Sequence, residues 1–205
     1  MRGKADSWNE SFICVLRSSS VNLLTMKLEA KKLSQELAED FFALHSQEPF
    51  GWCFCVAWEV PTWDNWNNRT AEKNRMFRQL LFDKKHLEGY LLYLDQKPVG
   101  WCQCGPRDRW VKLVKQYDLQ PDQQMYALTC FCLVPRYRKL GLTHIFLSQI
   151  LQDLKSQNVK RVQAFPRRGE HPDEDIWTGP ESLFIKAGFI LEKDDPVWPV
   201  YRLEL

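Results

Sequence analysis

The sequence lacks any apolar run approaching the ~18 residues needed to cross a membrane, and it carries almost no net charge. Lys and Arg total 28 against 26 Asp and Glu, a formal charge of +2, so no broad electrostatic field favours nucleic acid or an anionic membrane. The basic, apolar and small-residue pattern of a secretion signal is also missing. We therefore expect a soluble, cytoplasmic protein with neither nucleic acid nor membrane as a partner.

The low hydrophobicity of disordered chains is absent as well. Hydrophobic residues make up 44% and charged residues 26%, near the average of globular proteins. A length of 205 residues suits one sizeable domain, since single cores stop growing near ~250–300 residues. Residues 1–25 show no sustained hydrophobic period, so we expect an N-terminal extension followed by one domain over residues 26–205, as a monomer or a homodimer.

Cysteine and aromatic residues are abundant, with 7 Cys, 9 Trp and 12 Phe. An odd number of cysteines cannot all pair, and we expect reduced thiols. Three pairs lie in apolar runs typical of strands, where residues i and i+2 are roughly 6.5 Å apart, an awkward spacing for a shared tetrahedral metal. We expect buried thiols and no metal, with a thiolate nucleophile or redox pair as the alternative. The pairs are Cys53 and Cys55, Cys102 and Cys104, and Cys130 and Cys132.

Hydrophobic periodicity predicts helices alternating with short strands. A hairpin over residues 89–104 indicates antiparallel strands, and a strand–helix–strand unit over residues 125–165 indicates a parallel pair. The fold class is therefore α/β, a mixed and mostly antiparallel sheet with flanking helices. Strands are predicted at residues 51–58, 89–94, 99–104, 125–134, 159–165, 189–191 and 200–203, and helices at residues 33–44, 110–117, 141–157 and 180–187. Ser34 is the predicted N-cap of the first helix, and Thr70 is the predicted N-cap of a further helix. This further helix is predicted to bury a face formed by Met76, Phe77, Leu80 and Leu81.

A cation-rich turn joins the strand at residues 125–134 to the helix at residues 141–157. Pro135 cannot donate to a sheet ladder, so we expect the strand to splay from its neighbour and leave backbone groups for a ligand. Gly141 lets the backbone approach closely, and the amides and dipole of the following helix favour an anion. The turn predicts a pyrophosphate site, with solvated surface as the alternative for Arg136 and Lys139.

These residues resemble motif A of the GNAT superfamily of acyl-CoA N-acyltransferases, whose pattern is Val-x-Pro-x-Tyr-Arg-x-x-Gly-x-Gly/Ala. Residues 133–143 read Leu-Val-Pro-Arg-Tyr-Arg-Lys-Leu-Gly-Leu-Thr, with Leu133 and Thr143 departing conservatively. Residues 183–189, Leu-Phe-Ile-Lys-Ala-Gly-Phe, resemble motif B, and residues 97–101 resemble the central strands of the family. Three such segments in the right order imply a single GNAT-like domain with a splayed parallel strand pair.

The resemblance implies acetyl-CoA as co-substrate and transfer of its acetyl group to a primary amine of a small molecule or peptide, by direct attack in a ternary complex. An amide near Cys132 or Leu133 would stabilise the oxyanion. The backbone of Phe131, Cys132 and Leu133 would pair with the pantetheine arm. The turn amides of Arg138, Lys139, Leu140, Gly141, Leu142 and Thr143 would hold the pyrophosphate.

The acid and base are less evident from the sequence. The motif B tyrosine that commonly acts as the acid is Phe184 here, and Trp177 stands where an Asn often precedes it. For each residue that could act as the acid or base instead, a purely structural role is the alternative. The candidate catalytic residues are Tyr126, Ser182 and Cys132, with Thr129 and Thr178 also polar and within plausible reach.

The acceptor amine has two candidate contacts. Trp52 and Trp101, together with Trp58, Trp63 and Trp66, would form an aromatic wall that suits a flat or cationic amine, although a packed core is the alternative. The acidic loop at residues 167–178 would attract a cation or serve as a solvated connection. Two other functions stay open: a catalytically weak acyl-CoA-binding regulatory module, because the usual Tyr and Asn are missing, and a thiol-based protein that uses a Cys pair.

Overall fold

The computed structural model describes residues 27–172 and 176–205, so the extension expected over residues 1–25 lies outside the described residues. Seven strands form one sheet in the order β1-β2-β3-β4-β5-β7-β6. Among them β4 and β5 pair in parallel and the other neighbours are antiparallel, which confirms the mixed sheet. The strands are β1 (Leu28–Lys32), β2 (Tyr90–Leu94), β3 (Lys97–Pro106), β4 (Met125–Leu133), β5 (Arg161–Ala164), β6 (Ile190–Lys193) and β7 (Val200–Glu204).

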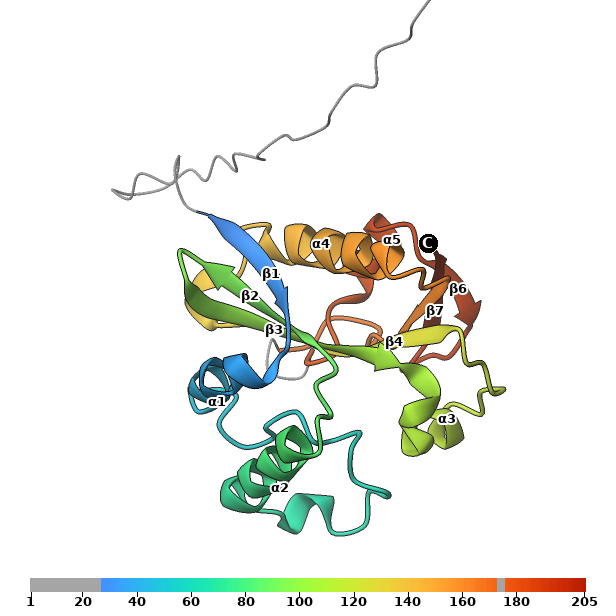
Figure 1. Ribbon diagram of the computed structural model, residues 1–205. Helices are drawn as coiled ribbons and strands as arrows, with labels where there is room; N and C mark the ends of the chain where they lie inside the picture. Colours follow the sequence, from blue (N-terminus) through green and yellow to red (C-terminus); the bar gives the residue numbers. More distant parts are fainter. Residues whose placement is uncertain (1–26, 173–175) are drawn as a thin grey trace, which may run out of the picture.

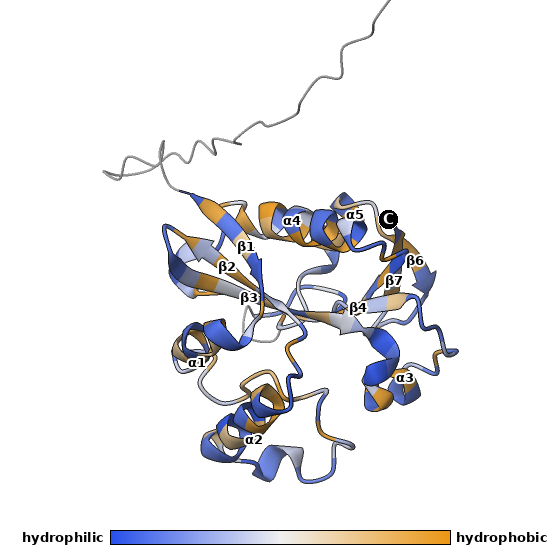
Figure 2. Ribbon diagram, viewed as in Figure 1, coloured by the Kyte–Doolittle hydropathy of each residue, from blue (hydrophilic) through white to orange (hydrophobic). Residues whose placement is uncertain are grey.

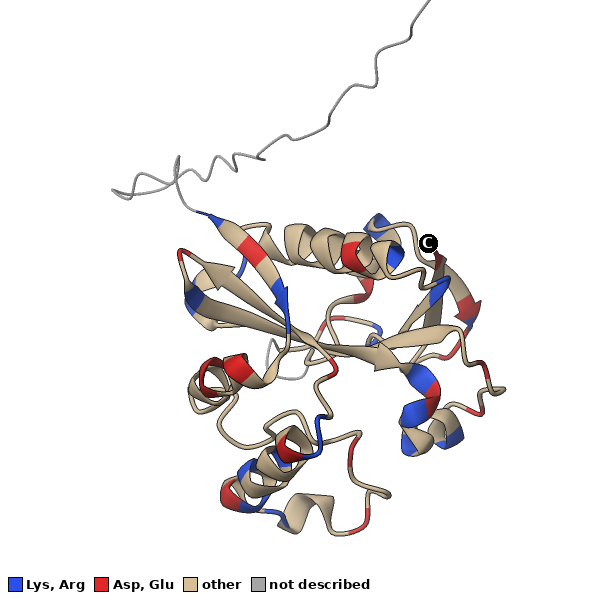
Figure 3. Ribbon diagram, viewed as in Figure 1, with Lys and Arg blue, Asp and Glu red and all other residues tan. Residues whose placement is uncertain are grey.

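Helices cover both faces of the sheet (Figure 1). On one face lie α4 (Leu142–Ser156) and α5 (Glu181–Lys186), and on the other lie α1 (Ala38–His45), α2 (Ala71–Asp83) and α3 (Val111–Gln116). Figure 2 shows hydrophobic and hydrophilic residues together on α2 and α4, as expected for helices with one face on a core. Charged residues lie mainly on the helices, loops and sheet edges, and β2 and β4 carry none (Figure 3). No helix in the described part of the chain is long and apolar enough to cross a bilayer.

The predicted hairpin is present but tighter than expected. Leu94 pairs directly with Lys97, which leaves Asp95 and Gln96 as a two-residue turn, both in the left-handed region with φ of 46° and 66°. Strand β1, which the sequence did not predict, pairs antiparallel with β2 at the sheet edge. Its Leu-Glu-Ala-Lys-Lys sequence is short, charged and only partly buried, so its hydrophobic pattern is weak.

Residues 51–58 form turns, so the predicted strand there is wrong. Phe54 and Cys55 have φ of 46° and 51°, and such left-handed residues cannot continue a strand. The buried face predicted for α2 is only partly correct, because Leu81 is buried but Met76 is 66% exposed. That helix instead buries Asn74 and Arg78 with Leu81 and Phe82, since both polar side chains bind the turns at residues 51–58.

The two predicted caps differ in outcome. Thr70 is the N-cap of α2, and its hydroxyl accepts a hydrogen bond from the Lys73 amide at 3.2 Å, as expected. Ser34 precedes a short 3-10 turn, Gln35–Leu37, and makes no side-chain capping bond. The helical stripe expected from Leu33 therefore begins as a 3-10 turn and becomes α-helical only at Ala38.

The parallel strands diverge at the middle of β4. Their pairing ends with Leu128 opposite Ala164, whereas β4 continues to Leu133. Beyond Ala164 the chain leaves the sheet through Pro166, which has no amide hydrogen to donate. The expected splay is present, but it begins well before Pro135, to which the sequence attributed it.

Candidate active site

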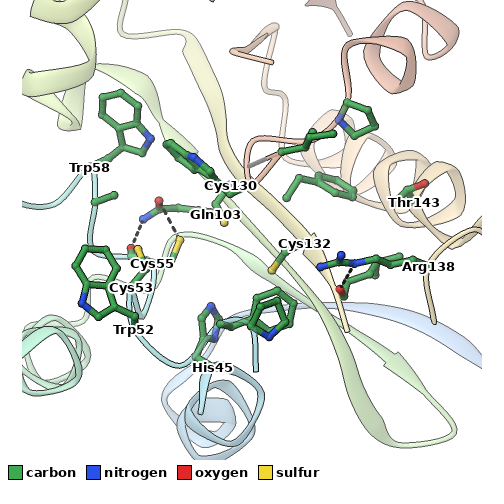
Figure 4. A pocket seen from close by; sticks show the side chains of 18 of the residues that line it. His45, Trp52, Cys53, Cys55, Trp58, Gln103, Cys130, Cys132, Arg138 and Thr143 are labelled. Carbon is green, nitrogen blue, oxygen red and sulfur yellow. Dashed lines mark hydrogen bonds between the residues drawn. The ribbon is translucent and has the colours of Figure 1, made fainter. Parts of the chain in front are cut away.

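A cavity of about 670 Å³ lies at the gap between the diverging strands. Phe131 and Leu133 face the core under α4, whereas Cys130 and Cys132 pack on the side of α1, and all four line the cavity. The cavity therefore reaches both faces of the sheet through the splay. Figure 4 shows it from Arg138 and Thr143 on one side to Trp52 and Trp58 on the other.

The Arg138 side of the cavity is the turn into α4. Gly141 is the N-cap of that helix with φ of 77°, a left-handed conformation that glycine adopts without strain. The first amides of α4 lack intrahelical partners, and the helix dipole adds positive potential there. The cofactor candidates Arg138, Lys139, Gly141, Leu142 and Thr143 line this end, whereas Leu140 packs against the core.

The open side of β4 is partly occupied by the protein itself. The Phe131 amide donates to Trp177 O at 2.8 Å, and Arg138 Nε donates to Leu133 O at 3.0 Å. Because backbone groups alternate sides along a strand, the Leu133 amide points the same way as its carbonyl. Loop residue Trp177 and turn residue Arg138 thus border the edge that the sequence predicts for a pantetheine arm.

Gln103 of β3 hydrogen-bonds to Cys55 and so links the turns at residues 51–58 to the sheet. Its Oε1 accepts from Cys55 Sγ at 3.3 Å and from Thr129 Oγ1 at 3.0 Å, and its Nε2 donates to Glu59 Oε1 at 3.0 Å. All four polar contacts of Gln103, including a bond from Nε2 to Cys55 O at 3.3 Å, are buried or partly buried. Thr129 therefore has a structural role here rather than an open hydroxyl.

Four cysteines line the cavity, and their environments differ. Burial, then the neighbouring Cys55, raises the pKa of Cys53 to about 11. Contacts with Cys132 and Cys55, followed by burial, raise the pKa of Cys130 well above its usual range. Burial acts to raise the pKa of Cys55, but contact with Cys130 and the charge of Arg78 bring it below the usual value. Among the described residues, no three His, Cys, Asp or Glu side chains are grouped to hold a metal ion.

The turns at residues 51–58, which form one wall, are held by buried side chains of α2 and α3. Arg78, only 1% exposed, donates from Nε to Phe54 O at 3.0 Å and from a terminal nitrogen to Cys55 O. Asn74 donates to Trp52 O at 2.9 Å, and Lys112 donates to Ala57 O. Asn74, Arg78 and Lys112 could not be predicted from the sequence, because polar residues on a buried helix face leave no hydrophobic signal.

Trp52 and Trp58 lie at the end of the cavity remote from Arg138 (Figure 4), and three further tryptophans that line the cavity have rings next to theirs, so the five form an aromatic wall. Ring centroids are 5.2 Å apart for Trp58 and Trp63, 5.0 Å for Trp52 and Trp66, and 6.2 Å for Trp58 and Trp177. The predicted contact Trp52 belongs to this wall. The other predicted contact, Trp101, is fully buried against Phe41 and does not line the cavity. The wall consists of Trp52, Trp58, Trp63, Trp66 and Trp177.

The catalytic candidates are not brought together. Cys132 lines the cavity, but Tyr126 and Ser182 do not. Tyr126 packs against the core under α4, where burial, then Cys104 and Glu88, raises its pKa. Ser182 lies in α5. Phe184 is fully buried, so the usual position of the acid holds an apolar ring away from the cavity surface.

Two other polar positions can be placed. Thr178 is 2% exposed, does not line the cavity, and its hydroxyl has no hydrogen-bond partner among the described residues. His45, which the sequence did not single out, lines the cavity and hydrogen-bonds from Nδ1 to Phe41 O at 2.9 Å. Burial lowers the pKa of His45 to about 3, so its ring is neutral at ordinary pH. Of the acidic loop, residues 173–175 lie outside the described residues.

The comparisons with known proteins agree with this geometry. The chain resembles the PaiA N-acetyltransferase of Thermoplasma acidophilum, solved with coenzyme A, at TM-score 0.53 and 14% identity, covering 87% of this chain and 99% of that one. An acetyltransferase of Thermus thermophilus matches at TM-score 0.51 and 19% identity, covering 87% of this chain and 97% of that one. An aminoglycoside acetyltransferase AAC(6')-Ib, solved with coenzyme A, matches at TM-score 0.57 and 13% identity, covering 87% of this chain and 95% of that one. No curated protein matches the sequence.

A family model supplies the assignment that these distant likenesses of fold cannot. The model of the acetyltransferase (GNAT) family matches residues 52–173, more than half of the chain. That segment includes the tryptophan-bearing turns, β4 and the turn into α4. The chain belongs to the acetyltransferase (GNAT) family.

Proposed function

We propose that the chain is an N-acetyltransferase that transfers an acetyl group from acetyl-CoA to a primary amine of a small molecule or peptide. The observation that carries the proposal is one continuous cavity with the turn into α4 at one end and an aromatic wall at the other. Both substrates can therefore occupy it together, which direct attack in a ternary complex requires. The splay between β4 and β5 lies between the two ends.

In this proposal the pyrophosphate of acetyl-CoA binds at the first turn of α4, between residues 138 and 143. Backbone amides and the helix dipole supply the positive potential there, so a protein with a net charge of +2 needs no basic surface. The pantetheine arm follows β4 past Leu133. The thioester then lies near Cys132 and Cys130, where the cavity passes to the other face of the sheet.

The acceptor nitrogen must lose its proton before it attacks, and an alkylamine has a pKa near ~10.4 in water. No carboxylate among the described residues lines the cavity. Lys112 indicates what burial does to an alkylammonium: burial lowers its pKa to about 8, although its Nζ lies 3.4 Å from the centroid of the Trp63 ring, a contact that favours the charged form. Desolvation in the apolar cavity would likewise favour the neutral acceptor amine.

The remaining needs of the reaction are an oxyanion donor and a proton for the departing thiolate. The Leu133 amide, on the open side of β4, is the proposed donor to the oxyanion. Cys132 is the proposed side chain beside the leaving thiolate, because Tyr126 and Ser182 lie off the cavity. The free thiol of coenzyme A has a pKa near ~8.5, so its protonation is the lesser barrier.

The test is release of free coenzyme A thiol from acetyl-CoA with a panel of primary amines, alongside direct measurement of acetyl-CoA binding. The proposal predicts binding and amine-dependent thiol release, with a mass increase of one acetyl group on the amine. Failure of both binding and release would overturn it.

A second candidate is the catalytically weak acyl-CoA-binding module, which the buried Phe184 favours because no phenol reaches the cavity there. It predicts tight acetyl-CoA binding without thiol release across the same panel. One set of measurements therefore separates the two functions.

A further inference from the structure

Trp58 has a buried hydrogen-bond donor with no partner. The side chain is 4% exposed and lines the cavity, and its Nε1 has no hydrogen-bond partner among the described residues. Figure 4 shows this nitrogen on the side of the indole that faces the middle of the cavity. A buried N–H without a partner is costly, so a ligand atom that accepts its hydrogen bond would be favoured here once the neighbouring side chains shift to admit it, because Nε1 itself is covered in the empty cavity.

The neighbouring indoles do not share this property. Trp52 Nε1 donates to Arg69 O at 3.0 Å, and Trp63 Nε1 donates to Gln116 Oε1 at 2.6 Å. Their polar edges are thus bound within the protein, and what remains for a ligand is the apolar surface of the rings. The aromatic wall therefore offers flat apolar surface with a polar donor at Trp58.

The electrostatics of this end disfavour a polycation. Lys112 Nζ lies 3.4 Å from the Trp63 ring centroid, 5.5 Å from that of Trp58 and 5.7 Å from that of Trp66, so a cation already uses these rings. The buried guanidinium of Arg78 lies behind the same turns. The nearby carboxylate of Glu59 interacts with Arg78 but is already paired with Arg109, and it does not line the cavity. A second positive charge here would be repelled, whereas an oxygen acceptor would be attracted.

We infer that the acceptor is an aromatic alkylamine that carries a hydrogen-bond-accepting oxygen on its ring, at the end remote from the amine. The ring lies against the aromatic wall, the oxygen accepts from Trp58 Nε1, and the amine points towards β4. This inference rests on the proposed acetyltransferase function and names its substrate class. A cavity of about 670 Å³ falls within the ~300–1,000 Å³ range of small-molecule sites.

The experiment compares 2-(4-methoxyphenyl)ethylamine with 2-(4-ethylphenyl)ethylamine, which differ by one oxygen in nearly the same shape. The wild-type protein is expected to favour the methoxy compound by about fivefold in kcat/KM, the effect of one neutral hydrogen bond. Trp58→Phe keeps a ring but removes the N–H, so it should bring this ratio to about one. Trp63→Phe, whose N–H is bound to Gln116, should leave the ratio unchanged even where it alters the rates themselves.

Spermidine serves as the polycationic competitor and needs no variant. Acetylation of spermidine with a higher kcat/KM than either arylalkylamine would overturn the inference while leaving the acetyltransferase function in place. Equal kcat/KM for the methoxy and ethyl compounds in the wild-type protein would overturn it as well, even if Trp58→Phe fails to fold. Absence of acetyl transfer to both arylalkylamines, with transfer to another amine of the panel, would overturn the inference alone, whereas absence of transfer to every amine of the panel would remove the proposed function and the inference together.

Discussion

Arg78 is predicted to support the acceptor end of the cavity from inside the fold. It is 1% exposed and donates to the carbonyls of Phe54 and Cys55, two consecutive residues in left-handed conformation. Such residues cost about 1–3 kcal/mol each and persist only where their surroundings hold them. Replacing Arg78 by Met keeps most of the aliphatic stem but removes both hydrogen bonds and the guanidinium, whose carbon lies 5.1 Å from the centroid of the Phe41 ring.

The size of the effect follows from these two bonds. A hydrogen bond to a charged group contributes about 1.5–3 kcal/mol, so two contribute about 3–6 kcal/mol. Removal of a buried guanidinium also relieves its desolvation cost, and we expect a net loss of about 2–4 kcal/mol in the free energy of unfolding. The KM of the acceptor should rise more than the KM of acetyl-CoA, because the turns at residues 51–58 line only the acceptor end.

The assay is urea unfolding followed by tryptophan fluorescence, with Arg75→Met as the matched control. Arg75 lies on the same helix but is exposed, with its guanidinium 4.6 Å from the Phe42 ring centroid. Its substitution should cost within about 1 kcal/mol. If Arg78→Met is no more destabilising than Arg75→Met, the proposed support of the left-handed turn is refuted.

Two other substitutions test the site's acid position and its titration. Phe184→Tyr should lower the free energy of unfolding by about 1–3 kcal/mol in urea without raising kcat between pH 7 and 9.5, because the ring is fully buried and an added hydroxyl must be accommodated inside the core. A kcat that rises at high pH would show that the phenol reaches the leaving thiolate. Lys112→Gln tests the lowered pKa of Lys112, which is about 8 in the folded protein against ~10.4 in the unfolded chain. Between these two pH values the unfolded state binds more protons than the folded state. The stability of the wild-type protein relative to the variant should therefore increase from pH 7.5 to 9.5. Urea unfolding of both proteins at the two pH values measures this difference, and a flat or falling difference contradicts it.

The sequence was sufficient to predict those features whose conformation depends on residues a few positions away in the chain. The turn into α4 could be predicted because Pro135 and Gly141 act through their own backbone, and Thr70 because a cap bonds three residues ahead. The divergence of β4 and β5 was predicted for the wrong reason. Its start is set by where β5 leaves the sheet after Ala164, a fact about the partner strand rather than about β4.

The acceptor end could not be predicted in the same way. Residues 51–58 have an apolar composition typical of a strand, but their conformation is set by Arg78 and Lys112, which lie more than twenty residues away in sequence. Trp58 and Trp101 also differ for a reason that composition cannot show. Trp101 is on β3 beneath α1, whereas Trp58 lies in the turns that border the cavity. Residue type predicted an aromatic wall that includes Trp52, Trp58, Trp63 and Trp66, but it wrongly added Trp101 and omitted Trp177.

The central claim is that coenzyme A binds at the first turn of α4, and calorimetric titration with acetyl-CoA tests it directly. Thr143→Glu places a carboxylate at the proposed pyrophosphate position, and it should not impair folding because a negative charge in the first turn suits the helix dipole. Ser148→Glu makes the same change in charge further along α4 on an exposed residue. The account predicts wild-type binding, at least about tenfold weaker binding by Thr143→Glu, and binding by Ser148→Glu within about twofold of wild type. Equal effects of the two variants, or no binding by the wild-type protein, would contradict the account.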